Sequence, residues 1–150
     1  MELRKTFLGN KYSDKCLVVF HGWGWNSLYL KIVLRPLFKY YSFLFYDYSP
    51  DIINPDPFSV LENFRKIKGD FLSEVNKLSQ KQLILFGTSL GAFLSTYLAN
   101  TPFEDNPQKL ILNTIGSSVS ETFWYGQATK KLKEKVIKKG FTLEDLKEIW

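Results

Sequence analysis

The 150-residue sequence has few of the residues that build disulfides and metal sites. It contains one cysteine, Cys16, and one histidine, His21. A lone cysteine excludes an intrachain disulfide framework and a cysteine-rich zinc site. No segment approaches the run of about 18 apolar residues that a membrane span needs, and residues 1–7 lack the apolar core of a secretory signal. The sequence therefore predicts a cytoplasmic protein that needs no metal or other cofactor.

The charge of the chain is moderately positive. Lysine and arginine number 20 and aspartate and glutamate 15, which gives a net charge of +5. This excess would suit an acidic partner, but without a zinc-finger, RRM or P-loop pattern it does not indicate nucleic-acid binding. Hydrophobic residues make up 45% of the chain and aromatic residues 17%, which excludes a disordered protein. The length is typical of one domain with a buried core.

Short apolar segments predict strands that are buried on both faces. They are residues 16–20, 41–48, 82–86 and 110–112. In the longest of them, large apolar side chains occupy both alternating faces, which is typical of strands in a parallel sheet with helices on either side. The fold class predicted from the residues is therefore α/β.

Segments between and after these strands have the apolar periodicity of helices. They are residues 28–40, 59–78, 90–100 and 123–139. In the second, apolar residues recur every three or four positions, and Ser59 and Glu62 predict a capping box at its start. Gly140 is expected to end the last of these helices. Thr142 and Asp145 then predict the start of another.

The sequence Gly-Thr-Ser-Leu-Gly at residues 87–91 follows a predicted buried strand and precedes a predicted helix. This is the pattern and context of a G-x-S-x-G nucleophile elbow. The sharp turn strains the backbone of Ser89 and lifts its hydroxyl above the sheet, while Gly87 and Gly91 leave room for the turn. The start of the following helix places N–H groups beside a developing oxyanion. The pattern predicts Ser89 as a catalytic nucleophile.

A second motif, Phe-His-Gly-Trp-Gly-Trp, follows the first strong strand and precedes a helix. With the elbow, and with the order of strands and helices along nearly the whole chain, it resembles the α/β-hydrolase superfamily and its HG-x-G oxyanion loop. The resemblance implies a three-layer fold with a mostly parallel sheet and helices on both faces. It also implies that the backbone N–H groups of Trp23 and Leu90 bind the oxyanion, and that His21, Gly22 and Gly24 support the loop.

Within the superfamily, the HGWG-W-N loop and the Tyr-Asp-Tyr strand end are similar to the pimeloyl-carrier methyl ester esterases of biotin synthesis. The resemblance implies hydrolysis of a small-molecule or carrier-linked acyl ester through an acyl-enzyme on Ser89. Trp25, Phe123, Trp124 and Tyr125 are expected to form an acyl pocket, with core packing as the alternative. The lysine-rich helix after them is expected to be solvated, with docking of an acidic carrier protein as the alternative.

The superfamily orders its triad as nucleophile, acid and histidine, but no histidine follows Ser89. Residues 1–120 are expected to be the N-terminal part of the hydrolase core and residues 121–150 the start of a helical lid. We therefore expect the C-terminal part of the fold to be missing from these residues. If no further strand paired with the last predicted strand, that strand would be an exposed apolar edge of the sheet. The catalytic histidine and acid are expected beyond Trp150, and His21 is expected to organise the oxyanion loop.

The function predicted from these patterns is that of a serine hydrolase for carboxylic esters that is nearly inactive as these 150 residues alone. Asp47 and Glu121 are expected to be turn or capping residues, with the role of triad acid as the alternative for each. A function of another class is that of a non-catalytic binding or scaffold protein that has kept the fold and lost the base. A third is a thioesterase or acyltransferase that uses the same triad.

Overall fold

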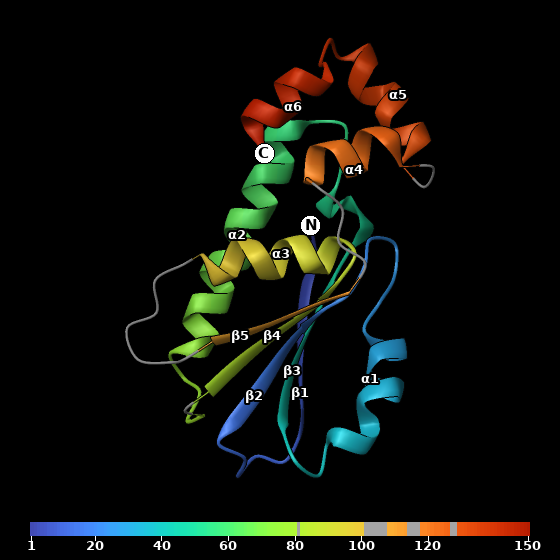
Figure 1. The fold of residues 1–150 in the computed structure, drawn as a ribbon. Helices are drawn as coiled ribbons and strands as arrows, with labels where there is room; N and C mark the ends of the chain where they lie inside the picture. Colours follow the sequence, from blue (N-terminus) through green and yellow to red (C-terminus); the bar gives the residue numbers. More distant parts are fainter. Residues whose placement is uncertain (81, 101–107, 114–117, 127–128) are drawn as a thin grey trace.

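The computed structural model describes residues 1–80, 82–100, 108–113, 118–126 and 129–150. Its centre is a five-stranded sheet in the order β1-β3-β2-β4-β5 (Figure 1). The strands are β1 (Leu3–Gly9), β2 (Lys15–Phe20), β3 (Ser42–Tyr48), β4 (Gln82–Thr88) and β5 (Gln108–Asn113). Strands β3, β2, β4 and β5 are parallel, whereas β1 runs antiparallel to β3. The α/β fold class predicted from the sequence is confirmed.

Strand β1 was not among the predicted strands. It pairs along its whole length with β3, from Leu3 opposite Tyr48 to Gly9 opposite Ser42. The strand lies at an edge of the sheet, and its residues are exposed or only partly buried. An edge strand can carry charged residues such as Arg4 and Lys5, so it lacks the continuous apolar run that marks the central strands.

The long helix α2 (Pro57–Val75) begins two residues before the position predicted for it. Asp56 is its N-cap, and the carboxylate accepts hydrogen bonds from the Phe58 N–H at 3.2 Å and from the Ser59 hydroxyl at 2.6 Å. The predicted capping box at Ser59 is therefore wrong: the acidic cap followed by Pro57 at the first helical position determines the start. The apolar stripe is confirmed, and its members are buried: Val60, Phe64, Ile67, Phe71 and Val75.

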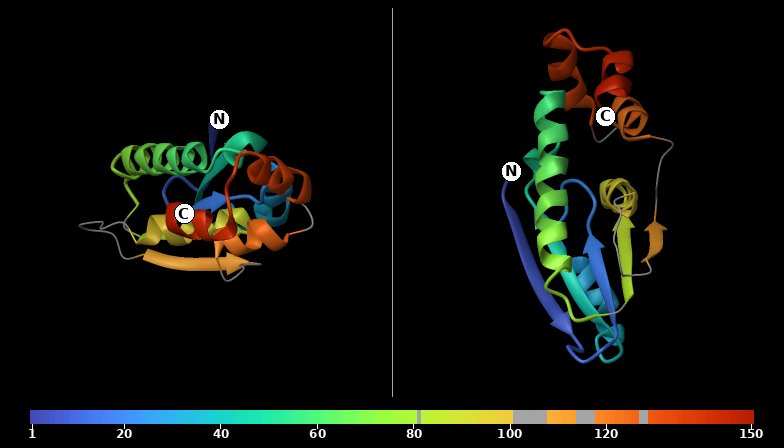
Figure 2. Two further views of the ribbon diagram at one scale, coloured as in Figure 1. Left: turned by 90° about the horizontal axis from the view of Figure 1, so that it is seen from above. Right: turned by 90° about the vertical axis from the view of Figure 1, so that its left-hand side faces the viewer.

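Helices cover both faces of the sheet, which gives three layers (Figure 2). Helix α2 and helix α3 (Leu90–Ala99) lie on one face, where their apolar residues join a large core with Phe20, Tyr46 and Leu85 of the strands. Helix α1 (Leu28–Leu34) covers the other face, where Leu30 packs in a smaller core with Phe45. The alternation of β3 side chains between these two cores explains why this strand is apolar on both faces.

Helix α1 is shorter than the predicted segment 28–40, because a 3₁₀ turn at Arg35–Leu37 with a proline at its centre replaces the α-helix after Leu34. Large apolar side chains on and just before α1 are 51–63% exposed: Trp25, Leu28, Tyr29, Ile32 and Val33. Strand β5 forms the other edge of the described sheet, and its Leu110 and Ile111 are 41% and 45% exposed. Both surfaces are more apolar than solvated surfaces of single domains usually are.

Three short helices lie above the carboxyl ends of the parallel strands (Figure 1). They are α4 (Val119–Tyr125), α5 (Lys130–Lys138) and α6 (Leu143–Ile149), and are called the cap helices below. Helix α6 packs against α2 and α4, and the Trp150 indole donates a hydrogen bond to the Pro57 carbonyl at 2.9 Å. Among the described residues, no helix has the length and apolarity needed to cross a membrane.

The single helix predicted over residues 123–139 is wrong, because α4 and α5 are separate helices. The hydroxyl of Thr129 donates to the carbonyls of Phe123 and Gly126, so a side chain satisfies the carbonyls that a continuous helix would pair with backbone N–H groups. The end of α5 at Gly140, with φ of +87°, is as predicted. The capping box of Thr142 and Asp145 at the start of α6 is confirmed.

Candidate functional site

Ser89 occupies the one-residue turn between β4 and α3. Its φ of +52° and ψ of −120° make it the one non-glycine residue with positive φ in the described part of the chain. Side chains rarely adopt this conformation, and residues held in it are concentrated at functional sites. The Ser89 N–H donates to the Asn113 carbonyl of β5 at 2.9 Å, which ties the strained turn to the neighbouring strand. The side chain is exposed and forms no hydrogen bond with the helix that it precedes.

The two glycines of the elbow are required by close backbone approaches. A Cβ atom on Gly87 would lie 2.1 Å from the carbonyl oxygen of Gly91, and a Cβ on Gly91 would lie 2.2 Å from the carbonyl oxygen of Phe20. Both distances are far below van der Waals contact, and both partners are backbone atoms that cannot rotate away. The glycines therefore let the first turn of α3 descend onto the ends of β4 and β2.

The loop after β2 lies beside the elbow because β2 and β4 are parallel neighbours, with Phe20 opposite Gly87. A Cβ on Gly22 would lie 3.4 Å from the Ser89 Cβ and 3.9 Å from its Oγ. Residues 21–27, which connect β2 to α1, are called the glycine-tryptophan loop below. The family resemblance implied this neighbourhood, since it has Trp23 and Leu90 bind the same oxyanion, and the sheet register brings the two motifs together.

The backbone at the elbow offers N–H groups for an anion. Leu90 is the first residue of α3, and the N–H groups of a helix's first turn have no carbonyl partner within the helix. The positive end of the helix dipole lies at the same place. Trp23, in the glycine-tryptophan loop, is the second predicted donor. Its indole Nε1 donates to the carbonyl of Pro50 at 2.7 Å, which holds this residue against the chain that follows β3.

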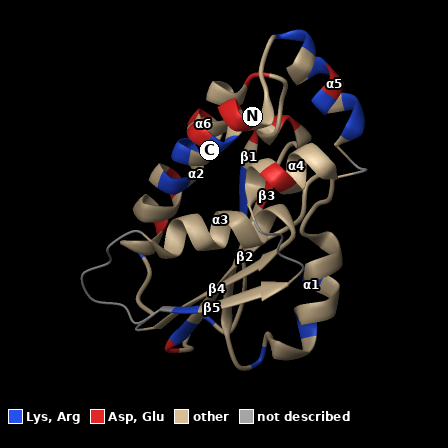
Figure 3. Ribbon diagram, turned by 45° about the horizontal axis from the view of Figure 1, so that its top comes forward, with Lys and Arg blue, Asp and Glu red and all other residues tan. Residues whose placement is uncertain are grey.

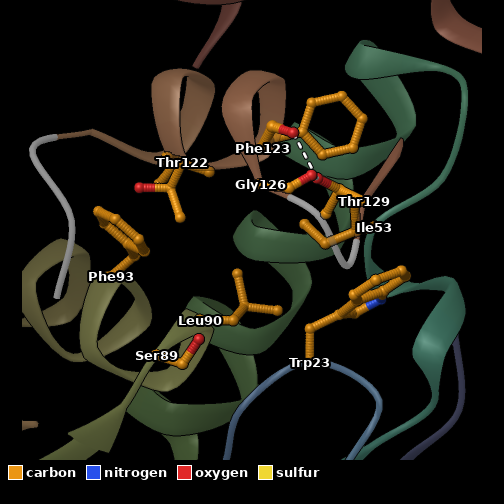
Figure 4. A pocket seen from close by; sticks show the side chains of 10 residues that line it. Trp23, Ile53, Ser89, Leu90, Phe93, Thr122, Phe123, Gly126 and Thr129 are labelled. Carbon is orange, nitrogen blue, oxygen red and sulfur yellow. Dashed lines mark hydrogen bonds between the residues drawn. The ribbon is translucent and has the colours of Figure 1, made fainter. Parts of the chain in front are cut away.

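A cavity of about 210 Å³ opens above Ser89, between the elbow and the cap helices (Figure 4). The serine hydroxyl points into it from below, beside Leu90 and Trp23, while Phe123 approaches from the cap. The lining is predominantly apolar and comprises Trp23, Ile53, Ser89, Leu90, Phe93, Val119, Thr122, Phe123, Gly126 and Thr129. A mostly apolar cavity with a few polar groups at one end is typical of a site for a small apolar ligand.

Of the four aromatic residues predicted to form an acyl pocket, Phe123 lines this cavity. The other three do not: Trp25 is 61% exposed and packs edge-on against Tyr29, and Tyr125 is 71% exposed. Trp124 is partly buried against the main core, with the Lys133 ammonium group 5.5 Å from the centre of its ring.

The cavity also contains residues that the sequence reasoning missed. Phe93 stands four positions after Ser89, so helical periodicity could have placed both on one side of α3. Ile53, Thr122 and Thr129 come from a loop and from the cap helices. Their positions depend on how distant segments pack, which no local pattern records.

His21 is 1% exposed, and both of its ring nitrogens are engaged. The Tyr48 backbone N–H donates to Nε2 at 3.2 Å, so Nδ1 carries the proton and donates to the Gly22 carbonyl at 2.7 Å. The ring also stacks on that of Tyr48, with 4.0 Å between centroids. Burial lowers the pKa of His21 below its ordinary value, against the opposing effects of the Gly22 carbonyl and the Asp47 carboxylate. The imidazole is therefore a neutral, fully bonded part of the scaffold.

The two carboxylates considered as triad acids have other partners. Asp47 accepts hydrogen bonds from the backbone N–H and the hydroxyl of Ser27, both at 2.6 Å, and pairs with Lys31 at 3.3 Å. Burial would raise its pKa, but the bonds from Ser27 and the charge of Lys31 lower it below the ordinary value. Glu121 forms an ion pair with Lys147 at 3.0 Å. Among the described residues, no three His, Cys, Asp or Glu side chains form a group that could hold a metal ion.

No protein-family model and no curated protein matches the chain. Solved structures do match it at low sequence identity. A lipase-esterase related protein from Clostridium acetobutylicum is 22% identical, with a TM-score of 0.60 over 91% of this chain. MenH from S. aureus is 21% identical, with a TM-score of 0.63 over 89% of this chain. An esterase from Exiguobacterium antarcticum is 20% identical, with a TM-score of 0.56 over 77% of this chain.

The fold is that of the α/β-hydrolases. The fold agrees with the one that the two sequence motifs imply. In this fold, the Ser89 elbow follows β4, an interior strand of the sheet, and precedes α3. The chain spans 64%, 51% and 42% of the lengths of the three solved structures named above. At these identities the likeness concerns the fold, so the chemistry has to be argued from the residues of the cavity.

Proposed function

We propose that the chain is the nucleophile-bearing core of a serine hydrolase that acts on carboxylic esters through an acyl-enzyme on Ser89. The observation that carries the proposal is the strained backbone of Ser89, with φ of +52°, at the floor of an apolar cavity. Strain of this kind persists where the surrounding structure imposes it, and here it presents an exposed hydroxyl that is not bonded to the helix it precedes, next to that helix's N-terminus. The fold shared with esterases supports the proposal.

In the proposed reaction, Ser89 Oγ attacks the ester carbonyl carbon and transfers its proton to a base. The carbonyl oxygen becomes an oxyanion that accepts hydrogen bonds from the backbone N–H groups of Leu90 and Trp23. Each such donor stabilises the transition state by about 3–4 kcal/mol in well-studied hydrolases. The alcohol leaves with a proton, and water then hydrolyses the acyl-enzyme by the same steps. The apolar lining of the cavity holds the acyl chain.

The base in this reaction comes from polypeptide other than these 150 residues. His21 is the chain's one histidine, and its hydrogen bonds to Tyr48 and Gly22 leave no nitrogen to receive the Ser89 proton. Without a base, a serine hydroxyl is a poor nucleophile at neutral pH. The apolar edge of β5 and the exposed apolar residues of α1 support the proposal, because further polypeptide packed there would bury them. The 150 residues alone are therefore expected to be nearly inactive.

The substrate that fits best is an acyl ester whose chain is short enough for a cavity of about 210 Å³. A carrier-linked acyl group is the finer form of this proposal. It is supported by α5 and the residue that follows it, which carry six lysines and one glutamate between residues 130 and 139 (Figure 3). This excess of five positive charges equals the net charge of the whole chain, and it lies at the cap. An acidic carrier protein would be attracted to this helix.

A second candidate is a non-catalytic protein that binds an acyl group in the same cavity. The observation that favours it is the engagement of His21 in the scaffold. Thioesterase and acyltransferase chemistry would use the same nucleophile and the same oxyanion donors. The acceptor and the leaving group distinguish those reactions, so turnover has to be measured with esters and thioesters side by side.

The test is chemical rescue of the missing base. The 150-residue protein and its Ser89→Ala variant are incubated with p-nitrophenyl butyrate, with and without imidazole, and product release and acylation of residue 89 are measured by absorbance and mass spectrometry. Imidazole is a small neutral base whose pKa lies near neutrality, and Ser89 is exposed to it. We expect little turnover without imidazole, and an imidazole-dependent rate above that of Ser89→Ala, with acyl-Ser89 detected.

Two outcomes would contradict the proposal in different ways. Fast, Ser89-dependent turnover without imidazole would show that a base is present in the chain. Equal rates for the wild type and Ser89→Ala at every imidazole concentration, with no acylated Ser89, would favour the non-catalytic function. Repeating the rescue with butyryl thioesters then separates esterase from thioesterase chemistry.

A further inference from the structure

The glycine-tryptophan loop is held by the carboxyl end of β3 and the residues directly after it. The first attachment joins Tyr48 to His21 at the start of the loop. The Tyr48 N–H donates to His21 Nε2 at 3.2 Å, the Tyr48 hydroxyl donates to the His21 carbonyl, and the two rings stack. Tyr48 is 5% exposed and His21 is 1% exposed, so water does not compete for these bonds.

The second attachment is in the middle of the loop, where the Trp23 indole donates to the Pro50 carbonyl at 2.7 Å. The third is at the loop's end, where the Asp47 carboxylate binds the N–H and the hydroxyl of Ser27, each at 2.6 Å. Lys31 of α1 pairs with the same carboxylate at 3.3 Å. Segment 47–50 thus contacts the beginning, middle and end of a loop that is only seven residues long.

Within the loop, the Trp25 N–H donates to the Gly22 carbonyl at 3.3 Å and closes a turn around Trp23 and Gly24. Gly24 has a φ of +75°, and a Cβ there would meet nothing within 4 Å. Trp25 and Asn26 are exposed. Glycines lower the cost of alternative backbone conformations, so external attachments add to this turn in keeping one peptide N–H in a fixed direction. The N–H that matters is that of Trp23, which lies between the first and third attachments.

We infer that Asp47 and Tyr48 are positioning residues that hold the oxyanion-binding N–H of Trp23 toward Ser89, by attaching both ends of the glycine-tryptophan loop to β3. The inference rests on the proposed function, because it assigns a purpose to the Trp23 N–H. Asp47 and Tyr48 are consecutive in β3, so their side chains leave opposite faces of the strand. One residue can therefore reach the start of α1 while the next reaches His21.

Strand β3 offers a matched control for each variant. Tyr46→Phe removes a buried tyrosine hydroxyl from the same strand, but that hydroxyl bonds Asp70 of α2 at 3.0 Å. It is the control for Tyr48→Phe. Asp70→Asn removes a carboxylate charge that pairs with Lys5 at 2.8 Å and is 28% exposed, against 25% for Asp47. It is the control for Asp47→Asn. The Tyr46 hydroxyl binds Asp70, and the Asp70 carboxylate binds Tyr46 and Lys5, so these side-chain bonds do not go to the glycine-tryptophan loop.

Two measurements on the full 150-residue protein test the inference. Hydrogen exchange by NMR follows the two N–H groups through which the loop is attached, the Ser27 backbone N–H and the Trp23 indole N–H, with Val18 and Leu85 in the central strands as references. In Tyr48→Phe and Asp47→Asn we expect exchange at the loop to increase about tenfold or more, while the references change no more than in the controls. In the imidazole-rescued reaction we expect kcat to fall about tenfold or more with KM unchanged, because the apolar cavity keeps its shape.

Each outcome decides the inference. If Tyr48→Phe and Asp47→Asn match Tyr46→Phe and Asp70→Asn in loop exchange, the attachments do not position the loop and the inference is wrong. If exchange rises equally in the loop and in the reference strands, the two residues serve global stability alone and the inference is again wrong. If the wild type shows no Ser89-dependent turnover, the proposed function fails, while faster loop exchange confined to Tyr48→Phe and Asp47→Asn still supports the attachment itself.

Discussion

The two turns that meet at the candidate site are held in different ways. The elbow at residues 87–91 is held by steric exclusion, because Gly87 and Gly91 each lie against a backbone carbonyl and Ser89 is forced to positive φ. The glycine-tryptophan loop is held by hydrogen bonds to a separate segment at the end of β3. One half of the site therefore depends on a five-residue pattern packed against the backbone of the neighbouring strands, whereas the other half depends on side chains about 20–27 positions away.

The largest expected effect comes from adding one methyl group to each turn. Gly91→Ala places a Cβ 2.2 Å from the Phe20 carbonyl oxygen, so we expect it to lower the free energy of unfolding by about 3 kcal/mol or more. A Cβ at Gly24 meets nothing within 4 Å, so Gly24→Ala is expected to lower the free energy of unfolding only through its positive φ, by about 1 kcal/mol. Urea denaturation followed by circular dichroism measures both. Equal losses of unfolding free energy in the two variants would show that the close approach at Gly91 does not constrain the elbow.

The two tryptophans that flank Gly24 separate the anchored part of the loop from the free part. Trp23→Ala removes the bond to the Pro50 carbonyl and part of the cavity wall, and we expect a loss of about 2 kcal/mol in the free energy of unfolding. Trp25→Ala alters a side chain that is 61% exposed, so the expected change is within about 0.5 kcal/mol. A larger loss for Trp25→Ala than for Trp23→Ala would contradict the proposed attachment of the loop.

The elbow was predictable from the sequence because its constraints are local. Strand, glycine, serine, glycine and helix follow one another within about 20 residues, and each residue's role can be inferred from its neighbours. The central strands were predictable for a related reason, since burial on both faces leaves a continuous apolar run in the sequence. The α/β fold class followed from the strand and helix patterns, and the three-layer fold was implied by the family resemblance that the two motifs support.

The attachment of the loop was not predictable in the same way. Asp47 was interpreted as a turn or capping residue, and its carboxylate does bind the N-cap residue of a helix, but that residue, Ser27, lies 20 positions earlier in the chain. A residue that serves a distant element carries no local signal. Strand β1 was missed because an edge strand needs no apolar run, and the break between α4 and α5 was missed because it depends on the Thr129 hydroxyl. The wall of the cavity opposite Ser89 is formed by the cap helices, whose positions depend on contacts of this kind.

A smaller effect is expected from relieving the strain at Ser89. Ser89→Gly and Ser89→Ala both remove the hydroxyl, but glycine adopts a φ of +52° without the clash that a Cβ causes. We expect Ser89→Gly to be more stable than Ser89→Ala by about 1 kcal/mol, since the relief of strain is partly offset by the greater freedom of glycine in the unfolded chain. Thermal unfolding of the two variants measures the difference. If alanine were the more stable, the turn would not store strain.

The smallest expected effect is a pH dependence that belongs to the loop and not to the elbow, which has no titratable side chain. The pKa of His21 is lowered in the folded protein from an ordinary value of 6.5. Just below pH 6.5, the imidazole therefore binds a proton more readily in the unfolded chain than in the folded chain. The neutral imidazole therefore makes its full contribution to the free energy of unfolding above pH 6.5, and this contribution declines as the pH falls below that value.

Two charged side chains near His21 have to be separated from this effect. Asp47 lies 3.8 Å from the imidazole, and its own pKa is lowered from 3.8, so its contribution is lost only at more acidic pH. Lys31, the other charged side chain, pairs with the Asp47 carboxylate at 3.3 Å. The difference in unfolding free energy between the wild type and His21→Gln, measured in urea from pH 7.5 downward, should shrink as the pH falls below 6.5. A difference that grows on acidification would mean that the folded protein favours the charged imidazole, and that His21 is available to exchange protons after all.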